Sequence, residues 1–305
     1  MASTAVTSVP NHKLRERPML ERTFRLVAHF SSATLLFACS RGPVERATTT
    51  NPPPTTTPVP YELVWADDFN TPGLPDASKW GYDVGDGCPS ICGWGNNELE
   101  YYTANRSENA RVENGNLIIE ARREQFGSRN YTSARLVSRT KGDWAYGRFE
   151  IRAKLPSGVG TWPAIWMLPT EWAYGGWPAS GEIDIMEHVG FAPDSIHGSI
   201  HTSAYNHTRG TQRTRAITIA DAEKAFHVYS IEWAEDRIDF YVDSTRYHSF
   251  SNEKSGFAVW PFDRTFHLLL NIAVGGNWGG QKGVDQNIWP QQMLVDYVRV
   301  YQRPR

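Results

Sequence analysis

The sequence predicts an all-β domain, a sandwich or a barrel, and three observations support this. Several segments alternate apolar and polar residues, and glycine and proline interrupt the chain at short intervals. No long stretch places apolar residues at helical spacing; a helical period is only weakly present near residues 220–226. Many short strands in one large domain are typical of these two architectures.

Individual strands can be assigned in order along the chain. Residues 147–156 alternate strictly, which predicts a half-buried strand. Residues 226–233 and 237–243 flank a short turn and predict a hairpin. The continuous apolar run at 265–276 predicts a strand covered on both faces, and residues 293–302 form another β-rich run near the end of the chain.

Composition limits the classes of function. The chain has 305 residues and a formal net charge of -2, with no basic stripe, so nothing favours a nucleic-acid partner. Its 12 tryptophans suit a cleft that stacks sugar rings, although a large aromatic core would also use them. We expect a monomer.

The N-terminal residues 1–39 predict export. From Met19 the chain carries two arginines and then a mostly apolar run that is too short for a stop-transfer helix. The run ends in Leu-Phe-Ala-Cys, which resembles the bacterial lipoprotein cleavage box with Cys39 as the lipidated residue. On that interpretation Met19 is the true start and the product is extracellular or a cell-surface lipoprotein. Ordinary signal cleavage, with an incidental Cys39, is the alternative.

Residues 40–60 predict a linker. Proline and threonine supply 12 of these 21 residues, a composition that favours extended polyproline II and lacks the apolar content for a core. No internal repeat and no second change in composition follows. The remainder, 61–305, is therefore expected to be one domain, large enough to bury a sizeable core.

Two cysteines lie close together in a loop that contains glycine and proline. Cys88 and Cys92 do not match the spacing of a paired zinc motif, and no second pair exists. In an exported protein a short-loop disulfide is the better prediction. Free thiols remain the alternative.

Residues 181–190, GEIDIMEHVG, carry three carboxylates among apolar residues. Glu182 and Asp184 are two apart, as on one face of a strand, but Glu187 follows after three. A regular strand would bury Glu187 with the two isoleucines, which is costly for a charged group without a partner. A one-residue β-bulge around Ile185–Met186 would return Glu187 to the face of the other two acids.

Three acids on one face indicate acid–base chemistry. With the bulge, the Cα atoms of Glu182 and Glu187 lie ~13 Å apart. Leaning side chains bring the carboxyls toward the ~5–5.5 Å of a retaining glycosidase, while the ~6.5–9.5 Å of an inverting enzyme stays open. Clustered carboxylates raise one another's pKa, so that one stays protonated while another is ionised. A solvated acidic face and a calcium site are the alternatives, disfavoured by the apolar flanks and by the absence of a Gly/Asp/Asn-rich loop.

The acidic segment resembles the active-site strand of family sixteen glycoside hydrolases, in the bacterial laminarinase form with the inserted methionine. Further segments similar to that family are LVWADDFN, CGWGNNELEYYT, NGNLIIEAR, TSARLVS, YGRFEIRAKLP, GTWPAIWMLP, GSIHT, NIAVGGNWGG and DYVRVYQ. The resemblance covers most of residues 61–303. It implies a β-jelly-roll sandwich of two antiparallel sheets with an open cleft, and internal cutting of β-1,3-glucan with retention.

The resemblance also implies roles for individual residues. Glu182 corresponds to the nucleophile, Glu187 to the acid/base and Asp184 to the residue that tunes the nucleophile. His201 is expected on a neighbouring strand, near Asp184 and Glu187. The expected sugar-binding side chains are Asn96, Arg135, Trp162, Trp166, Trp177 and Trp278.

Many members of this family hold a structural calcium ion away from the cleft. The matching positions are the carbonyls of Asp68 and Gly115 and the carboxylate of Asp296. No cofactor is expected for catalysis. A non-catalytic glucan-recognition protein of the same fold is the alternative function, disfavoured because all three acids are present. Rival activities are mixed-linkage glucan hydrolysis, which we expect as a second activity, galactan cleavage and transglycosylation.

Overall fold

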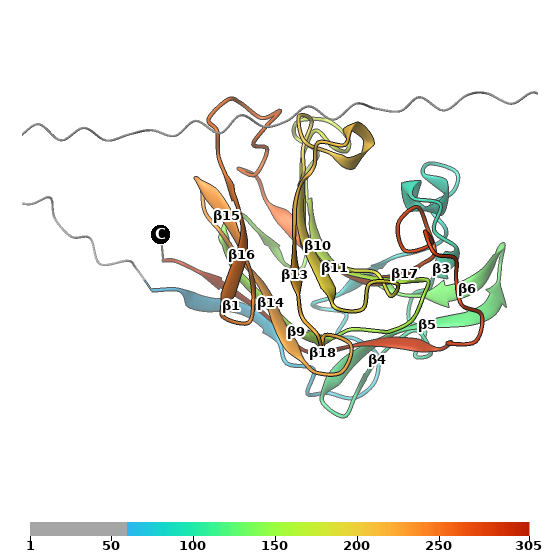
Figure 1. The fold of residues 1–305 in the computed structure, drawn as a ribbon. Helices are drawn as coiled ribbons and strands as arrows, with labels where there is room; N and C mark the ends of the chain where they lie inside the picture. The colour runs from blue at the N-terminus through green and yellow to red at the C-terminus, as the bar shows by residue number, and fades with distance from the viewer. Residues whose placement is uncertain (1–59, 305) are drawn as a thin grey trace, which may run out of the picture. The chain divides into compact units, whose positions relative to one another are not determined.

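Two β-sheets lie face to face in the computed structural model, which describes residues 60–304 (Figure 1). The chain divides into Met1–Thr55 and Thr56–Arg305, and every described residue lies in the second unit. The predicted export segment and all of the predicted linker except Pro60 lie outside the described residues. Within 60–304, no helix has the length and apolar content needed to cross a membrane.

The larger sheet has ten strands and the smaller has eight. Among the described residues, the named strands pair antiparallel except β3 and β6, which are parallel. In spatial order the ten-stranded sheet contains β16 (Thr245–Ser251), β15 (Arg237–Val242), β14 (His227–Trp233), β9 (Gly147–Lys154), β18 (Gln291–Gln302), β5 (Asn116–Phe126), β6 (Arg129–Ser133) and β3 (Glu100–Tyr102), with β1 (Glu62–Asp67) on β18 and β4 (Ala110–Glu113) on β5.

The eight-stranded sheet carries the acidic segment on its third strand. Two short 3-10 segments, η1 (Cys92–Gly95) and η2 (His207–Arg209), lie in loops. In spatial order this sheet contains β13 (Arg213–Thr218), β12 (Ser195–His201), β11 (Glu182–His188), β10 (Thr161–Pro169), β17 (Phe266–Val274), β7 (Arg135–Val137) and β2 (Gly81–Asp83), with β8 (Asp143–Trp144) on β17.

The predicted strands are present. β9 alternates buried and half-buried residues along its whole length, β14 and β15 form the predicted hairpin, and all nine residues of β17 are buried. The weak helical pattern at 220–226 forms a turn, in which the N–H groups of Lys224 and Ala225 both bond to the carbonyl of Asp221.

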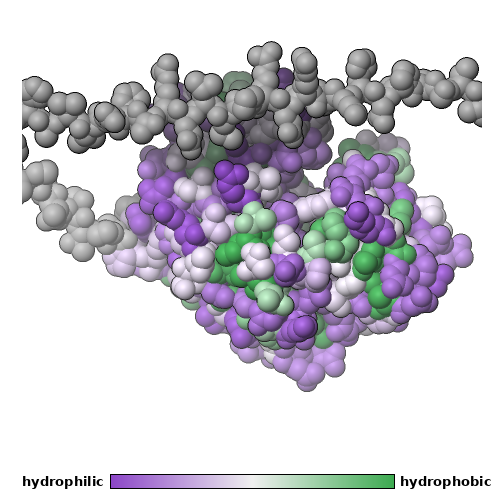
Figure 2. All heavy atoms as spheres, viewed as in Figure 1, coloured by the Kyte–Doolittle hydropathy of each residue, from purple (hydrophilic) through white to green (hydrophobic). Residues whose placement is uncertain are grey.

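One apolar core fills the space between the sheets. Ile183 and Met186 reach it from the eight-stranded sheet, and Phe149 and Val298 reach it from the ten-stranded sheet. Each large apolar side chain buried in this way contributes about 1.5–3 kcal/mol. Figure 2 shows one face of the molecule, on which hydrophilic residues predominate and the hydrophobic patches are small and separate.

Candidate active site

The acidic strand β11 contains the predicted bulge. Against β12, Asp184 pairs with Ser199 and Glu187 pairs with His197. Residues 185–186 therefore lie opposite a single residue of the partner strand. A second irregularity appears at the same place in the pairing of β11 with β10.

The bulge decides where the third acid points. Ile185 and Met186 are consecutive, yet both are buried, with 1% and 0% exposure. Because two successive side chains turn inward, Glu187 returns to the face that carries Glu182 and Asp184. The prediction that one extra residue realigns the three acids is confirmed.

Two tryptophans hold the outer acids by hydrogen bonds. The indole N–H of Trp177 donates to Oε2 of Glu182 at 2.9 Å, and that of Trp162 donates to Oε1 of Glu187 at 3.1 Å. Trp177, expected from the sequence to bind sugar, thus also contacts one of the acids directly. Each indole fixes one carboxyl rotamer and presents its ring beside it.

His201, on the neighbouring strand β12, lies in the acidic cluster. Its Nε2 is 3.2 Å from Oδ2 of Asp184 and 3.8 Å from Oε1 of Glu182. In the register of β11 and β12, His201 faces Glu182, whereas the cross-strand partner of Glu187 is His197. His201 therefore lies on the neighbouring strand beside Asp184, as expected, and also close to Glu182, while its charge acts on Glu187 and lowers the pKa of that acid.

Burial shifts the protonation of all three acids. Loss of water raises the pKa of Glu182, of Asp184 and of Glu187 to about 8, and the charge of Asp184 adds to this for both glutamates. Among the described residues, no lysine or arginine forms an ion pair with the three. The cluster therefore keeps protons near neutral pH and titrates as a unit, so it can donate a proton from one member while another is ionised.

Arg135 lies beside two aromatic side chains on the next part of the sheet. Its guanidinium carbon is 4.6 Å from the ring centre of Trp166 and 4.6 Å from that of Trp94. Its Nε is 3.1 Å from a carboxylate oxygen of Asp83. The sequence predicted Arg135 and Trp166 as sugar-binding residues but not Trp94.

A chain of hydrogen bonds connects Trp166 to the other predicted polar residue, Asn96. The indole of Trp166 donates to Asn271 at 2.8 Å, whose amide donates to the hydroxyl of Tyr102 at 2.9 Å. Tyr102 donates to Glu98 at 3.2 Å, and Asn96 donates to the same carboxyl at 3.2 Å. Sequence reasoning missed Asn271, although it is the one polar residue within the apolar run LLLNIAV.

The ring of Trp278 packs against that of Trp162. The two rings meet edge to face with centres 5.7 Å apart, and Trp278 also meets the ring of His197 at 4.9 Å. His207, which the sequence did not single out, contacts Trp177 with ring centres 5.0 Å apart. The predicted aromatic residues are thus arranged around the acids rather than dispersed in the core.

The three expected calcium positions lie on neighbouring strands. Gly115 directly precedes β5, Asp68 directly follows β1, and both of these strands pair with β18 near the irregular position Asp296. However, the Asp296 carboxylate already binds Arg152 at 2.7 Å, and the Asp68 carboxylate binds Arg299 at 2.8 Å. The backbone arrangement fits a calcium site that uses the carbonyls of Asp68 and Gly115. The Asp296 carboxylate, however, would have to bind the ion together with Arg152 or in place of it.

A second group could hold a cation. Atoms of Glu182, Asp184 and His201 lie within 4.8 Å of one another. The raised pKa values of Glu182 and Asp184 keep these two carboxyls protonated near neutral pH, which disfavours a cation there.

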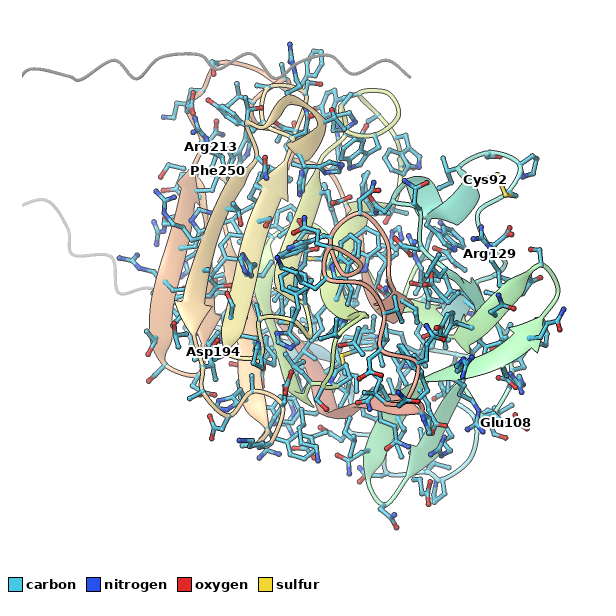
Figure 3. All side chains as sticks on the ribbon, turned by 45° about the vertical axis from the view of Figure 1, so that its right-hand side comes forward. Cys92, Glu108, Arg129, Asp194, Arg213 and Phe250 are labelled. Atoms are coloured by element: carbon cyan, nitrogen blue, oxygen red, sulfur yellow. A yellow bond between two sulfur atoms is a disulfide. The ribbon has the colours of Figure 1, made fainter. Side chains whose placement is uncertain are left out.

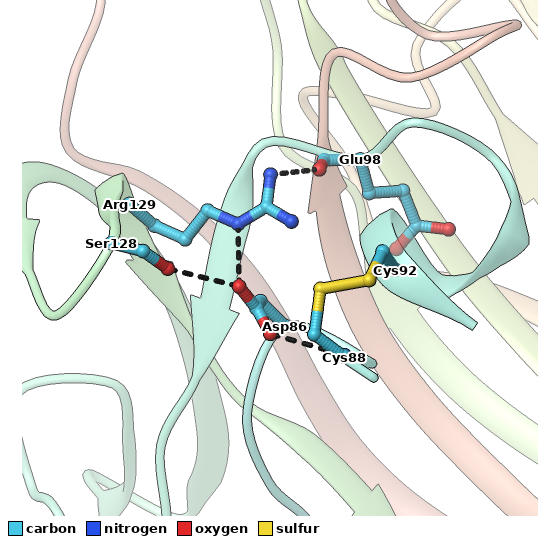
Figure 4. The surroundings of a disulfide bond; sticks show 6 residues. All are labelled: Asp86, Cys88, Cys92, Glu98, Ser128 and Arg129. Atoms are coloured by element: carbon cyan, nitrogen blue, oxygen red, sulfur yellow. Dashed lines mark hydrogen bonds and ion pairs between the residues drawn. A yellow bond between two sulfur atoms is a disulfide. The ribbon is translucent and has the colours of Figure 1, made fainter. Parts of the chain in front are cut away.

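Cys88 and Cys92 are joined by a disulfide (Figure 4). The closed turn ends at Cys92, the first residue of η1, and Trp94 and Asn96, which follow it, lie on the Arg135 side of the site. In the view of Figure 3, Cys92 lies on the opposite side of the domain from Arg213 and Phe250.

Comparison with known proteins agrees with this geometry. The family model described as glycosyl hydrolases family 16 matches residues 97–299, which include the acidic strand and its neighbours. The chain belongs to glycosyl hydrolase family 16. It is therefore a glycoside hydrolase.

Relatives of this family 16 enzyme include a beta-glucanase of Rhodothermus marinus, 59% identical over 79% of this chain and 85% of the relative. The solved laminarinase of Rhodothermus marinus has a TM-score of 0.79 and 57% identity over 82% of this chain and 100% of its own. A non-specific endo-beta-1,3(4)-glucanase, co-crystallised with 1,3-beta-D-cellotriosyl-glucose, has a TM-score of 0.76 and 51% identity over 80% and 96% of the two chains. These solved structures establish the jelly-roll sandwich that the sequence predicts.

Proposed function

We propose that this enzyme is a retaining endo-glycosidase that hydrolyses internal β-1,3-glucosidic bonds in laminarin-type glucans and also cuts mixed-linkage β-1,3-1,4-glucan. The observation that carries the proposal is the acidic trio on the bulged strand, with two acids held by indole N–H groups. The laminarinase and the beta-1,3(4)-glucanase with which the fold aligns support the substrate class.

The reaction proceeds by two displacements. Protonated Glu187 donates its proton to the glycosidic oxygen while ionised Glu182 attacks the anomeric carbon, and a covalent glycosyl-enzyme forms. Glu187, now ionised, takes a proton from water, which attacks the same carbon and releases the sugar. The cycle needs no cofactor.

The neighbours of the acids suit these two roles. Asp184 lies between the outer acids and 3.2 Å from His201, so it controls the charge that Glu182 experiences. The indole of Trp177 donates to Glu182, which favours the ionised form of the nucleophile. Trp162, Trp166 and Trp278 present aromatic faces to sugar rings, and Arg135 and Asn96 offer donors to hydroxyl groups.

A pair of digests tests the proposal. Purified protein is incubated with laminarin and with lichenan, and the oligosaccharide products are followed over time. Short oligomers from laminarin, with equal or slower cutting of lichenan, are expected. Lichenan cleavage alone would contradict the preference for β-1,3 bonds.

A substitution tests the role of the nucleophile. Glu182→Ser removes the attacking carboxylate, so glycosidase activity should be lost while the fold and glucan binding remain. Retained activity would contradict the assignment of Glu182. A wild-type chain that binds laminarin and cleaves neither glucan would instead favour the alternative, a glucan-recognition protein.

We also propose export, with lipid attached at Cys39, and a monomeric state. The charged and apolar N-terminal segment and its Leu-Phe-Ala-Cys ending support export. Expression of the full chain in a bacterium with labelled palmitate tests the lipid: label on the wild type and none on Cys39→Ala is expected. Light scattering of residues 61–305 tests the monomer.

We also propose a structural calcium ion held by Asp68, Gly115 and Asp296. The ion would tie the ends of β1 and β5 to β18 and add stability, not chemistry. Chelation should therefore lower the melting temperature of the wild type and leave that of Asp296→Asn unchanged. An equal response of both would contradict the site.

A further inference from the structure

Trp94 has an unusual backbone conformation. Residues Gly93, Trp94 and Gly95 have φ values of 63°, 54° and 79°, so a bulky residue lies in the left-handed region between two glycines. That region is unfavourable for a side chain such as tryptophan, and residues held there cluster at binding sites. Surrounding contacts must therefore hold Trp94 in place.

Ring contacts rather than hydrogen bonds position the Trp94 side chain. Its ring centre is 4.6 Å from the guanidinium carbon of Arg135 and 5.5 Å from the ring centre of Tyr102. Its indole N–H is buried and has no acceptor among residues 60–304. The same guanidinium is 4.6 Å from Trp166, so two indoles from separate segments pack against one arginine.

The loop that carries Trp94, residues 86–97, is fastened at its base; we call it the disulfide loop. Asp86 accepts hydrogen bonds from the N–H of Cys88 at 3.1 Å, from the hydroxyl of Ser128 at 2.9 Å and from Nε of Arg129 at 3.1 Å (Figure 4). Arg129 also donates to the carbonyl of Glu98 at 3.1 Å. Both ends of the loop are therefore tied to the turn between β5 and β6.

The interior of the loop is equally tight. A Cβ atom on Gly87 would lie 2.3 Å from the carbonyl oxygen of Ile91 and 2.9 Å from the backbone nitrogen of Trp94. The disulfide thus closes a turn in which the backbone already approaches Trp94. Opening the turn would release the segment that holds the indole.

We propose that Trp94 is a positioning residue for substrate binding: the disulfide loop holds its indole against Arg135 and so fixes the guanidinium for contact with glucan hydroxyl groups. This inference rests on the proposed function, in which Arg135 and Trp166 bind the glucan. A guanidinium packed by two aromatic rings and held by Asp83 at 3.1 Å loses little further freedom on binding. Without Trp94, part of that ordering must occur when the sugar binds.

Steady-state kinetics on laminarin test the role of Trp94. Trp94→Ala should raise KM about tenfold and leave kcat within about twofold, because the acids are untouched. Trp94→Phe should restore most of the loss. Ile91→Ala is the matched control, since Ile91 lies in the same loop with 53% exposure, and should behave as wild type.

The disulfide gives a second, independent test. The double variant Cys88→Ser/Cys92→Ser should raise KM several-fold, and it should add nothing in the Trp94→Ala background. Dithiothreitol should act in the same way on the wild type, because its two thiols become a cyclic disulfide as the cysteines become free thiols. If Trp94→Ala does not fold, the Trp94→Phe and double-serine variants still decide.

Failure of the inference differs from failure of the proposed function. Wild-type cleavage of laminarin with an unchanged KM in Trp94→Ala would overturn the role of Trp94 alone, as would additive effects of the two changes. A wild-type chain that neither binds nor cleaves laminarin would overturn the proposed function, and this inference with it.

Discussion

Two groups of buried carboxylates, one on β11 and one on β5, differ in what surrounds them. The side chain of Asp184 is 4% exposed and that of Glu120 is 3% exposed, so burial alone does not separate them. Glu120 contacts Arg111 at 3.0 Å and also contacts Arg122. Asp184 has only a histidine as its ion-pair partner among the described residues.

The same contrast appears in the pKa values of two glutamates. Hydrogen bonds from Arg106 are the largest cause that lowers the pKa of Glu124, to about 2, whereas burial raises the pKa of Glu187 to about 8. An acid with an arginine is a permanent anion that serves the structure. The trio, which has no arginine ion pair within residues 60–304, retains protons near neutral pH, and the proposed chemistry needs one of them on Glu187.

Glu187→Gln gives the largest expected effect. Removing the proton donor should lower kcat/KM on laminarin about 10²–10⁴-fold, because general acid–base catalysis contributes that much. Added azide should restore turnover of an aryl glucoside with a good leaving group, since an anion can attack the glycosyl-enzyme without base assistance.

The matched control for Glu187→Gln is Glu120→Gln, which changes an equally polar group on the arginine-paired side. Its kcat should stay within about twofold of wild type. Comparable losses in both variants would mean that the contrast between the two groups does not describe function.

Glu182→Gln should stabilise the fold by about 1–3 kcal/mol at pH 8. The pKa of Glu182 is about 8 in the folded state and about 4.3 in the unfolded state. Between about pH 4.3 and pH 8 the folded state binds more protons than the unfolded state, so the free energy of unfolding of the wild type falls as pH rises. Because glutamine does not titrate, the variant does not undergo this part of the decrease. Urea unfolding at pH 5 and pH 8 measures the difference.

Glu124→Gln should show the opposite sign. With a folded pKa of about 2, Glu124 contributes stability above pH ~4.5 that is lost as pH falls toward 2. Its side chain is 30% exposed, so the loss at pH 7 should be only about 1 kcal/mol. Stability changes of the same sign in the two variants would contradict the comparison.

The sequence predicts the acidic site well because its signal is local. Glu187 breaks the alternation set by Glu182 and Asp184, and a one-residue β-bulge is the simplest way to bring all three to one face. The structure has this bulge at residues 185–186. The strands around it follow from alternation that is equally local, as in β9. The neighbour of each acid on β12 is less local, because the pairing of Glu182 with His201 and of Glu187 with His197 depends on how the bulge is accommodated across the two strands.

The Arg135 side of the site was less predictable because its contacts are distant in sequence. The hydrogen bond between Asn271 and Tyr102 joins residues 169 positions apart. Asn271 stands out as the one polar residue in the run LLLNIAV, but no local pattern indicates that Tyr102 is its partner. The sequence around Trp94 shows no periodic pattern or motif spacing that marks this residue, and its left-handed backbone conformation is seen only in the structure. Sequence thus predicts residues that break a local rule better than residues whose role is set by tertiary partners.

Asp184→Asn should have the smallest effect and test the comparison most finely. After burial, the charge of Asp184 is the next cause that raises the pKa of both Glu182 and Glu187. Removing it should move the alkaline limb of the kcat/KM profile to lower pH by roughly 0.5–1 unit, since Glu187 would lose its proton sooner.

The control for this shift is Asp239→Asn, on an acid that is equally buried but paired with Arg237 at 2.9 Å. That change should leave the limb where it is. If Asp184→Asn lowers kcat and the limb stays fixed, Asp184 acts on the geometry of Glu182 and not on the shared proton. The lack of an arginine ion pair to the trio within residues 60–304 would then matter less than the two indole hydrogen bonds that orient its outer members.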